Sequence, residues 1–564
     1  MVDGFRPRRW YTVAVNDSAQ LVLGPLLRHV GERDATIWVE TDRSCEVEVL
    51  GHRAATWQVG GHHYALVVVR GLEPGTTTQY EVRLDDALVW PDADAGLPPS
   101  QIRTFDPATP IQLLFGSCRY ARPDAVAGNS RFAPDALDTY ARRMQHMPQS
   151  EWPDAVLLLG DQVYADETTD ETRSRIRERR SVEEAPYEQV RDFEEYTWLY
   201  EESWTDPEIR WLLSTLPTAM IFDDHDVHDD WNTSESWRRD MQETSWWEER
   251  IIGGLSSYWV YQHIGNLSPE ELDDDEMYQQ VISQEGDCEQ ILRDFAARAD
   301  AEADGAKGTR WSYRRIFANT ALLMIDSRCG RILEGDHRAM VSESEFAWIE
   351  EHTAGEYDHL LIGTSLPWLL PRSFHDVESW NEVLSKGERG ERMARWAEKF
   401  RRFADLEHWA AFRDSFDRLA RMLAMVGNGE HEGSNGRAPA TICVLSGDVH
   451  HAYAAKVHFD RDVESAVYQL TCSPVHNYVP GFMKIGFRVA WSRAASTVTR
   501  FLLRRIARVP DQPLTWTREA GPFYGNEIAT LVIDGRTARM RLERAGRDSN
   551  GDPELTEVVD LRLA

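Results

Sequence analysis

Four segments of the sequence place polar residues directly after a short run of apolar ones. In the clearest case, residues 156–159 are apolar, Gly160 and Asp161 follow, and Tyr164 comes three residues later. Short apolar runs are typical of buried strands in an α/β sheet, and α/β proteins bind ligands at the carboxyl ends of such strands. Because Gly-Asp is also a common turn, this segment alone is a weak indication of a site.

Three further segments repeat the arrangement and end in thiol, carboxylate and imidazole groups. The apolar runs 111–115, 219–222 and 442–445 lead into Gly116-Ser117-Cys118-Arg119, Asp223-Asp224-His225-Asp226 and Ser446-Gly447-Asp448-Val449-His450-His451, respectively. These groups, like the phenol of Tyr164, can bind metal ions. Four such ends in one chain predict a single assembled metal site at the carboxyl ends of four strands.

The four motifs, in this order, resemble those of the alkaline phosphatase D (PhoD-like) family. Two more stretches, Asp326-Ser-Arg-x-x-Arg331 and Leu406-Glu-His-Trp-x-x-Phe412, fit the pattern of that family as well. The motifs span residues 116–451, and a β domain in front of them is also typical of the family. The resemblance implies an α/β fold of the metallophosphoesterase superfamily, a sandwich of two mixed β-sheets flanked by helices.

For the first metal, the expected ligands are Cys118, Asp161, Tyr164 and His450. Asp161 is the expected bridging carboxylate, because its two oxygens can bind two ions at once. Thiolate and phenolate are anionic donors and together favour Fe³⁺. The resemblance to alkaline phosphatase D likewise implies iron, with calcium as its companion.

For the second metal, the expected ligands are the carboxylates of Asp161, Asp224 and Asp448. The superfamily carries a further metal histidine after a strand, but here the comparable strand ends in Gly363-Thr-Ser365-Leu-Pro367. Oxygen donors without this histidine favour Ca²⁺. Zn²⁺, Mn²⁺ and Mg²⁺ are the alternatives.

Two residues next to predicted ligands are candidates for catalysis. His225 follows Asp224, and in the superfamily this histidine contacts the substrate phosphate and can protonate the leaving oxygen; the alternative is a histidine that only supports a ligand. Arg119 could bind a phosphate oxygen or form a structural salt bridge. His228 and His451 are less specific candidates.

The predicted reaction is hydrolysis of a phosphate ester at a two-metal site by a hydroxide that the metals activate. A small-molecule or a lipid ester would fit, and the motifs do not choose between monoester and diester. The basic stretch 484–508 motivates an alternative, a phosphodiesterase or phospholipase-type enzyme on nucleic acid or lipid, since a basic amphipathic helix can lie on anionic lipid. It could instead cover the catalytic domain. An alternative of another class is a non-catalytic adhesion or scaffold protein on a degenerate phosphatase fold.

The charge and the cysteine content of the chain argue against some classes of protein. The net charge of −32 argues against general nucleic-acid binding. The chain has six cysteines and no C-x-x-C pair, which is typical of a reducing compartment. We find no transmembrane run and no secretory apolar segment near the N-terminus, so we expect a cytoplasmic, bacterial protein. Nothing in the sequence predicts an oligomeric state.

Two domains are expected. Residues 1–107 contain alternating strand patterns and a Gly-Leu-x-Pro-Gly-Thr turn at 71–76 that resembles fibronectin type III domains, which predicts a small all-β sandwich. Residues 108–564 form the expected catalytic domain, including a basic helical segment at 480–510 and C-terminal strands within 525–564. One long helical region is predicted over 391–421.

Overall fold

The structure is a computed structural model, and it describes most of the chain. The described ranges are 18–92, 95–121, 132–301, 309–333, 338–387, 389–479, 481–507 and 512–564. Residues 1–17, the first part of the predicted N-terminal domain, lie outside these ranges. The expected absence of a signal peptide concerns these same residues.

The N-terminal region contains only β-strands in antiparallel sheets. One sheet has the order β1-β2-β6-β5, a second has the order β4-β3-β8-β9, and β10 pairs with β7. The strands are β1 (Leu21–Val30), β2 (Asp34–Thr41), β3 (Glu46–Val49), β4 (His52–Ala55), β5 (Trp57–Val59), β6 (His62–Arg70), β7 (Thr77–Gln79), β8 (Val82–Leu84), β9 (Ala87–Trp90) and β10 (Gln101–Arg103). The predicted all-β region is confirmed, and its fibronectin III-like character and its boundary at 107 stay predictions.

Two mixed sheets form the centre of the molecule. The six-stranded sheet has the order β13-β12-β11-β21-β22-β23, with β11, β12 and β13 parallel. Its strands are β11 (Ile111–Gly116), β12 (Ala155–Leu159), β13 (Thr218–Ile221), β21 (Glu527–Asp534), β22 (Thr537–Arg547) and β23 (Pro553–Arg562). The C-terminal strands predicted within 525–564 therefore belong to this sheet.

The seven-stranded sheet has the order β14-β15-β16-β17-β19-β18-β20, and β15, β16, β17 and β19 are parallel. Its strands are β14 (Tyr313–Phe317), β15 (Thr320–Ile325), β16 (His359–Thr364), β17 (Thr441–Ser446), β18 (Ala452–Phe459), β19 (Ala466–Thr471) and β20 (Leu514–Phe523). The six-stranded sheet thus has a parallel half, β13-β12-β11, and an antiparallel half, whereas the seven-stranded sheet has a parallel centre and antiparallel flanks. Both sheets are mixed, as in the predicted α/β sandwich.

Successive side chains of the central strands point to opposite faces of the sheet and so contribute to two hydrophobic cores. On β15, Leu322 and Met324 belong to the core shared with the six-stranded sheet, whereas Leu323 and Ile325 belong to a second core that includes helix residues such as Phe346. Strands buried on both faces have continuous apolar sequences. This is why the apolar runs in the sequence marked the central strands.

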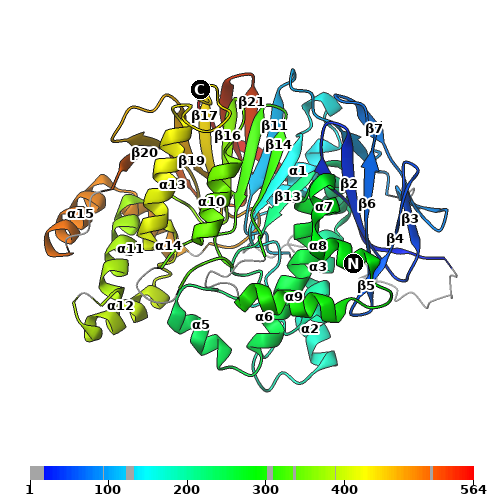
Figure 1. Ribbon diagram of the computed structural model, residues 1–564, viewed down its shortest axis with the longest axis horizontal. Helices are drawn as coiled ribbons and strands as arrows, with labels where there is room; N and C mark the ends of the chain where they lie inside the picture. Colours follow the sequence, from blue (N-terminus) through cyan, green and yellow to red (C-terminus); the bar gives the residue numbers. More distant parts are fainter. Residues whose placement is uncertain are drawn as a thin grey trace.

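Helices cover the outer faces of the sandwich (Figure 1). They are α1 (Ala136–Met144), α2 (Asp170–Arg179), α3 (Phe193–Trp204), α4 (Pro207–Thr215), α5 (Glu235–Gln242), α6 (Trp247–Tyr258), α7 (Pro269–Asp274), α8 (Glu276–Ser283), α9 (Glu289–Ala301), α10 (Glu343–His352), α11 (Arg372–Ser385), α12 (Glu391–Phe403), α13 (Arg413–Val426), α14 (Gly481–Ala490) and α15 (Arg493–Ala507). The predicted fold class, two mixed sheets flanked by helices behind an all-β region, is confirmed.

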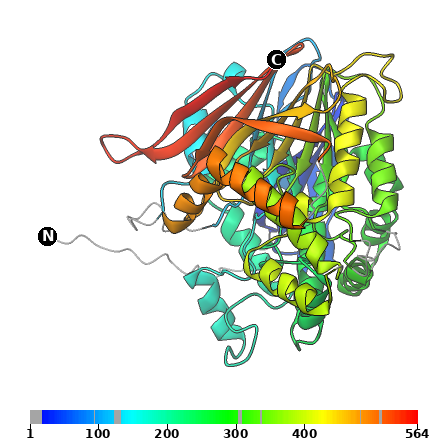
Figure 2. The same ribbon diagram turned by 90° about the vertical axis from the view of Figure 1, so that its left-hand side faces the viewer.

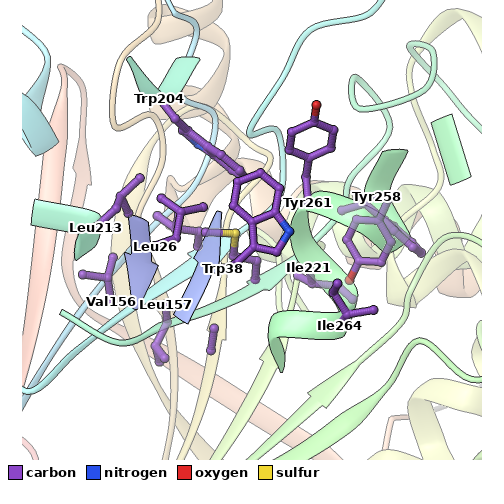
Figure 3. Close-up of a cluster of buried hydrophobic side chains, with 14 of the residues drawn as sticks. Leu26, Trp38, Val156, Leu157, Trp204, Leu213, Ile221, Tyr258, Tyr261 and Ile264 are labelled. Carbon is purple, nitrogen blue, oxygen red and sulfur yellow. The ribbon is translucent and has the colours of Figure 1, made fainter. Parts of the chain in front are cut away.

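The N-terminal strands share a core with the catalytic region. Figure 3 shows Leu26 of β1 and Trp38 of β2 close to Leu157 of β12 and Ile221 of β13. All four side chains are buried. The N-terminal region is therefore packed against the sheet that carries the Asp161 motif.

The long helical region predicted over 391–421 is wrong, because the chain leaves the helix between α12 and α13. Asp405 has a left-handed φ of 52°, and Leu406 N donates to Arg401 O at 3.1 Å, the pattern of a Schellman helix end. Glu407 and His408 then form buried contacts with Arg328 and Asp448. Within the predicted basic helical segment 480–510, the described residues form two helices, α14 and α15.

None of the helices in the described residues is both long and apolar enough to cross a membrane.

Candidate metal centre

The carboxyl ends of the central parallel strands of both sheets meet in one place. Cys118 N, two residues after β11, donates to Gly160 O at 3.2 Å, and Asp448 N, two residues after β17, donates to Ser117 Oγ at 3.2 Å. Gly447 N donates to Ser365 O after β16 at 2.9 Å. Hydrogen bonds donated by backbone N–H groups therefore join the strand ends after β11, β12 and β17, three of the four that the sequence predicted as one site.

Four of the six predicted metal ligands have a left-handed backbone. The φ angles are 56° at Cys118, 51° at Asp161, 65° at Asp448 and 49° at His450. This conformation is uncommon for residues other than glycine and is concentrated at functional sites, where the surrounding fold imposes it. It turns the chain sharply just after each strand.

Two glycines permit this close approach of the loops. Gly160 has φ of 107°, and a Cβ there would lie 2.6 Å from Asp223 Cβ. A Cβ on Gly447 would lie 1.9 Å from Ser117 Oγ. Any larger residue would separate the loops that carry Cys118, Asp161 and Asp448.

Asp161, Asp224 and His225 form the first cluster of donors. Each places one ligand atom within 4.8 Å of the other two, and Asp161 Oδ1 is buried without a hydrogen-bond partner. Burial and the charge of Asp223 raise the pKa of Asp161 well above its ordinary value. A cation would compensate a buried carboxylate of this kind, so these residues fit a metal ion.

Cys118 and Tyr164 lie close enough to Asp161 for their charges to interact. Burial and Asp161 raise the pKa of Cys118, and burial, Asp161 and Cys118 together raise the pKa of Tyr164. The Ser473 hydroxyl lies 3.1 Å from Cys118 Sγ, and Asn477 Nδ2 donates to the Tyr164 hydroxyl at 3.0 Å. Three groups that repel one another as anions are a donor set that a metal ion stabilises.

His450 lies in the same region as a neutral imidazole. Burial and the charge of His225 lower the pKa of His450 to about 4. The neutral form is the one that binds metal ions.

Arg328 lies at the centre of a second cluster, which contains Asp223, Asp224 and Asp448. Its fully buried guanidinium places Nε 2.5 Å from Asp223 Oδ1, and Nη2 lies 3.2 Å from Asp224 Oδ1 and 3.4 Å from Asp448 Oδ1. Nη1 donates to Glu407. A fixed positive charge thus compensates the carboxylates of this cluster, a role that the sequence alone did not predict.

His408 is a second residue whose place the sequence did not predict. Its Nδ1 lies 2.8 Å from Glu378 Oε1 on α11, and its Nε2 lies 3.0 Å from Asp448 Oδ2. Burial acts in the opposite direction, yet the hydrogen bond with His408 holds the pKa of Asp448 below its ordinary value. The motif Leu406-Glu-His was the only sequence signal for it.

The two other histidines considered from the sequence have different partners. His451 pairs its Nδ1 with Val449 O at 2.7 Å, and its Nε2 lies 3.3 Å from Trp491 Nε1. His228 stacks on Trp246, with ring centroids 5.8 Å apart. His408, in contrast, has its Nε2 3.0 Å from Asp448 Oδ2, an oxygen of a predicted second-metal ligand.

His225 is oriented by Asp166, which the sequence analysis did not single out. Its Nδ1 lies 2.9 and 3.1 Å from the two carboxylate oxygens of Asp166, and its ring lies 4.8 Å from that of Tyr164. Burial opposes protonation, but Asp166 raises the pKa of His225 well above its ordinary value. Asp166 fixes the ring through Nδ1, and Nε2 lies 3.9 Å from Asp229 Oδ1, beyond hydrogen-bond distance.

Arg119 forms the salt bridge that the sequence left as one alternative. Its Nε donates to Asp135 Oδ2 at 2.8 Å, and its Nη1 donates to Ser203 O at 2.7 Å. Asp135 also caps helix α1 by accepting from Leu137 N at 2.8 Å. Contact between Arg119 and a phosphate stays a prediction.

Two segments of the chain match protein-family profiles. The profile of the PhoD-like phosphatase family matches residues 125–291, and a domain of unknown function (DUF7800) matches residues 18–102. No curated protein matches the chain.

Two solved structures match most of the chain. "Structure of PhoD" has a TM-score of 0.55 at 10% identity, over 97% of this chain and 90% of that chain. Purple acid phosphatase PPD1 from yellow lupin (Lupinus luteus) seeds has a TM-score of 0.47 at 10% identity, over 97% of this chain and 75% of that chain. The family match favours an enzyme over the scaffold alternative. Residues 125–291 of the chain are thus similar to PhoD-like phosphatases, and its fold is similar to that of PhoD.

Proposed function

We propose that this phosphatase hydrolyses phosphate esters at a site for two metal ions. Cys118, Asp161, Tyr164 and His450 would hold the first ion, and Asp161, Asp224 and Asp448 would hold the second. The observation that carries the proposal is the buried Asp161, whose Oδ1 has no partner and which lies within 4.8 Å of donors from Asp224 and His225. A buried carboxylate oxygen without a partner is costly unless a ligand completes it.

The protein residues would act by orientation and proton transfer. When bound, the metal ions would supply a nucleophile near neutral pH and charge that stabilises the phosphoryl oxygens. Asp166 holds the His225 ring through Nδ1, so Nε2 can give its proton to the leaving oxygen. Arg119 would reach a phosphate oxygen through Nη2, because its Nε and Nη1 are occupied by Asp135 and Ser203.

The donor chemistry favours Fe³⁺ in the first position and Ca²⁺ in the second. The thiol of Cys118 and the phenol of Tyr164 suit Fe³⁺. The second position offers carboxylate oxygens, which suit Ca²⁺, whereas Zn²⁺ would ordinarily have a nitrogen or sulfur donor. If a nitrogen completes the second position, His408 is the candidate, because it already contacts Asp448.

A calcium chelator tests this assignment. We expect the treated enzyme to lose hydrolysis of para-nitrophenyl phosphate and of its diester while it keeps iron and a visible charge-transfer band. Added Ca²⁺ should restore both activities, and the ratio of the two rates will show which ester class is preferred. Iron-containing but colourless protein would contradict the roles of Cys118 and Tyr164.

Recovery with Zn²⁺ but not with Ca²⁺ would contradict the oxygen-donor assignment. In that case His408→Gln should abolish the recovery, while His458→Gln, a change at an exposed histidine, should not. If neither ester is hydrolysed by protein that contains its full complement of metal, the proposed function is wrong.

A further inference from the structure

Exposed apolar side chains are concentrated on three helices. Fourteen large apolar side chains in the described residues are exposed, and seven of them lie on α12, α14 and α15. They are Met393, Trp396, Phe403, Val489, Val498, Phe501 and Leu502, and Phe403 is 88% exposed. Such a concentration on a small part of the surface indicates a binding face.

The three helices lie on one side of the molecule, around α11. Asn381 of α11 donates to Ala397 O of α12 at 2.8 Å, and Ser373 of α11 donates to Ala490 O of α14 at 2.7 Å. Arg500 of α15 lies 3.4 Å from Asp376 of α11. Figure 2 shows these helices together on the side turned toward the viewer, opposite the N-terminal strands. We call this surface the α12–α15 face.

The α12–α15 face is basic in a strongly acidic chain. Residues 481–507 contain six lysines and arginines and no acidic residue, and α12 has five lysines and arginines, of which Arg401 is buried, against two glutamates. The whole chain carries a net charge of −32. Arg392, Lys399 and Arg488 are exposed, so the local charge is opposite to that of the rest of the molecule.

We propose that the α12–α15 face docks on an anionic lipid surface. Helices that combine exposed apolar residues with arginine and lysine lie in the interface of membranes, and anionic lipid attracts basic residues near its surface. A symmetric dimer through this face would place basic residues against basic residues. Charge therefore favours an anionic membrane over a second copy of the chain.

Docking through this face would bring the candidate metal centre close to the lipid surface. Glu378 of α11 holds His408, which in turn contacts Asp448. Phe487 of α14 packs 4.4 Å from the ring of His451, next to His450. The inference concerns where the enzyme works and does not depend on which phosphate ester it cleaves.

Flotation of the full chain with vesicles tests the proposal. We expect binding to vesicles of equimolar phosphatidylcholine and phosphatidylserine, weak binding to phosphatidylcholine alone, and a decrease as salt is raised. The double variant Arg392→Glu/Lys399→Glu should weaken binding by at least about tenfold. The control Arg33→Glu/Arg298→Glu changes two exposed arginines away from the face and should leave binding as in the unaltered chain.

The apolar contribution has its own control. Phe403→Ser/Leu502→Ser should weaken vesicle binding, whereas Leu88→Ser/Ile316→Ser, at exposed sites on β9 and β14, should not. Hydrogen exchange needs no variant, and peptides covering 391–403 and 489–502 should become protected when vesicles are added. Turnover of a soluble ester should be the same in all four variants.

Several results would overturn the proposal. One is the absence of binding to anionic vesicles, and another is binding that the control variants lose as strongly as the face variants. Protection of the same peptides by self-association in the absence of lipid would assign the face to a second copy. Equal affinity for polyglutamate would assign it to an acidic polypeptide.

Discussion

The two mixed sheets contribute differently to the candidate metal centre. Behind β12 and β13 of the six-stranded sheet, Asp161 Oδ1 and Asp223 Oδ2 are buried without hydrogen-bond partners. Behind β15 and β17 of the seven-stranded sheet, Asp326 accepts three backbone N–H groups, and Asp448 contacts Arg328 and His408. The six-stranded sheet thus presents in Asp161 a carboxylate that needs a cation, whereas Arg328 already compensates Asp223. The protein already satisfies the carboxylates of the seven-stranded sheet.

This difference shows how one fold can combine carboxylates that bind metal ions with carboxylates that hold the surrounding loops in place. Unpartnered buried carboxylates destabilise a fold unless a ligand completes them, whereas satisfied ones fix loops. We infer that the six-stranded sheet supplies most of the binding capacity and that the seven-stranded sheet holds the loops in register. Asp448 combines the two roles, since it is a predicted metal ligand and also a hydrogen-bond partner of His408.

The largest expected effect is that of Asp161→Asn on catalysis. Loss of the bridging carboxylate should lower kcat/KM by more than about a thousandfold, because metal ions contribute several kcal/mol to transition-state stabilisation. The free energy of unfolding should change by less than about 1 kcal/mol. Steady-state kinetics and urea denaturation measure the two quantities.

Asp534→Asn is the matched control for that variant. Asp534 also ends a strand of the six-stranded sheet, but β21 runs antiparallel to β11, so Asp534 lies at the opposite end of the sheet. Its substitution should leave kcat/KM unchanged. Turnover retained by Asp161→Asn would show that Asp161 is only a turn residue.

A smaller effect, on stability, is expected for Arg328→Met. The change leaves Asp223 and Asp224 buried without their counter-charge, while Glu407 keeps its contact with Arg331, and such losses cost about 3–5 kcal/mol. Urea denaturation of metal-replete protein should show a decrease of this size in the free energy of unfolding. A decrease no larger than that of Arg298→Met, a change at an exposed arginine, would mean that Arg328 does not stabilise this cluster.

An ion-paired histidine far from the candidate metal centre, His62, serves as a reference for the effects of changes within that centre. His62 of β6 lies 2.9 Å from Glu40 of β2 and 2.9 Å from Glu194 of α3. Burial opposes protonation, but Glu194 and Glu40 raise the pKa of His62 to about 9. The protonated form is therefore favoured by folding, and its contribution is complete below pH about 6.5 and is lost as pH rises through about 9.

The smallest effect is expected for His62→Gln. At pH about 6 the variant should unfold with about 1–2 kcal/mol less free energy than the unaltered chain, and the difference should shrink as pH rises past about 9. Urea denaturation at both pH values measures it, and kcat/KM should be unchanged. A difference that grows with pH would contradict the assigned ion pair.

Much of the fold was predictable because its signals are local. Apolar runs marked the central strands, and the turn Asp534-Gly535 marked the hairpin of β21 and β22, which the structure pairs from Asp534 to Thr537. The strand-end motifs after β12 and β13 brought Asp161 and Asp224 together for the same reason. In an α/β sheet, parallel neighbours end on the same side.

The remaining parts of the site depend on packing over long sequence separations. Arg328 reaches Asp223 across 105 residues, and His225 reaches Asp166 across 59. His408 was hidden inside a predicted helix, because the sequence around it is compatible with a helix and only its contacts with Glu378 and Asp448 favour the break. Such partners follow from the tertiary fold and leave no local pattern.

The metal content of two matched variants tests the central claim most directly. Asp161 and Asp326 both follow a central parallel strand, one in each sheet, and elemental analysis of Asp161→Asn and Asp326→Asn compares them in a single measurement. We predict that Asp161→Asn stays folded and loses most of its metal, while Asp326→Asn keeps its metal and loses about 1–3 kcal/mol of stability, because its backbone hydrogen bonds weaken. Equal metal content in the two folded variants would contradict the division of roles between the sheets.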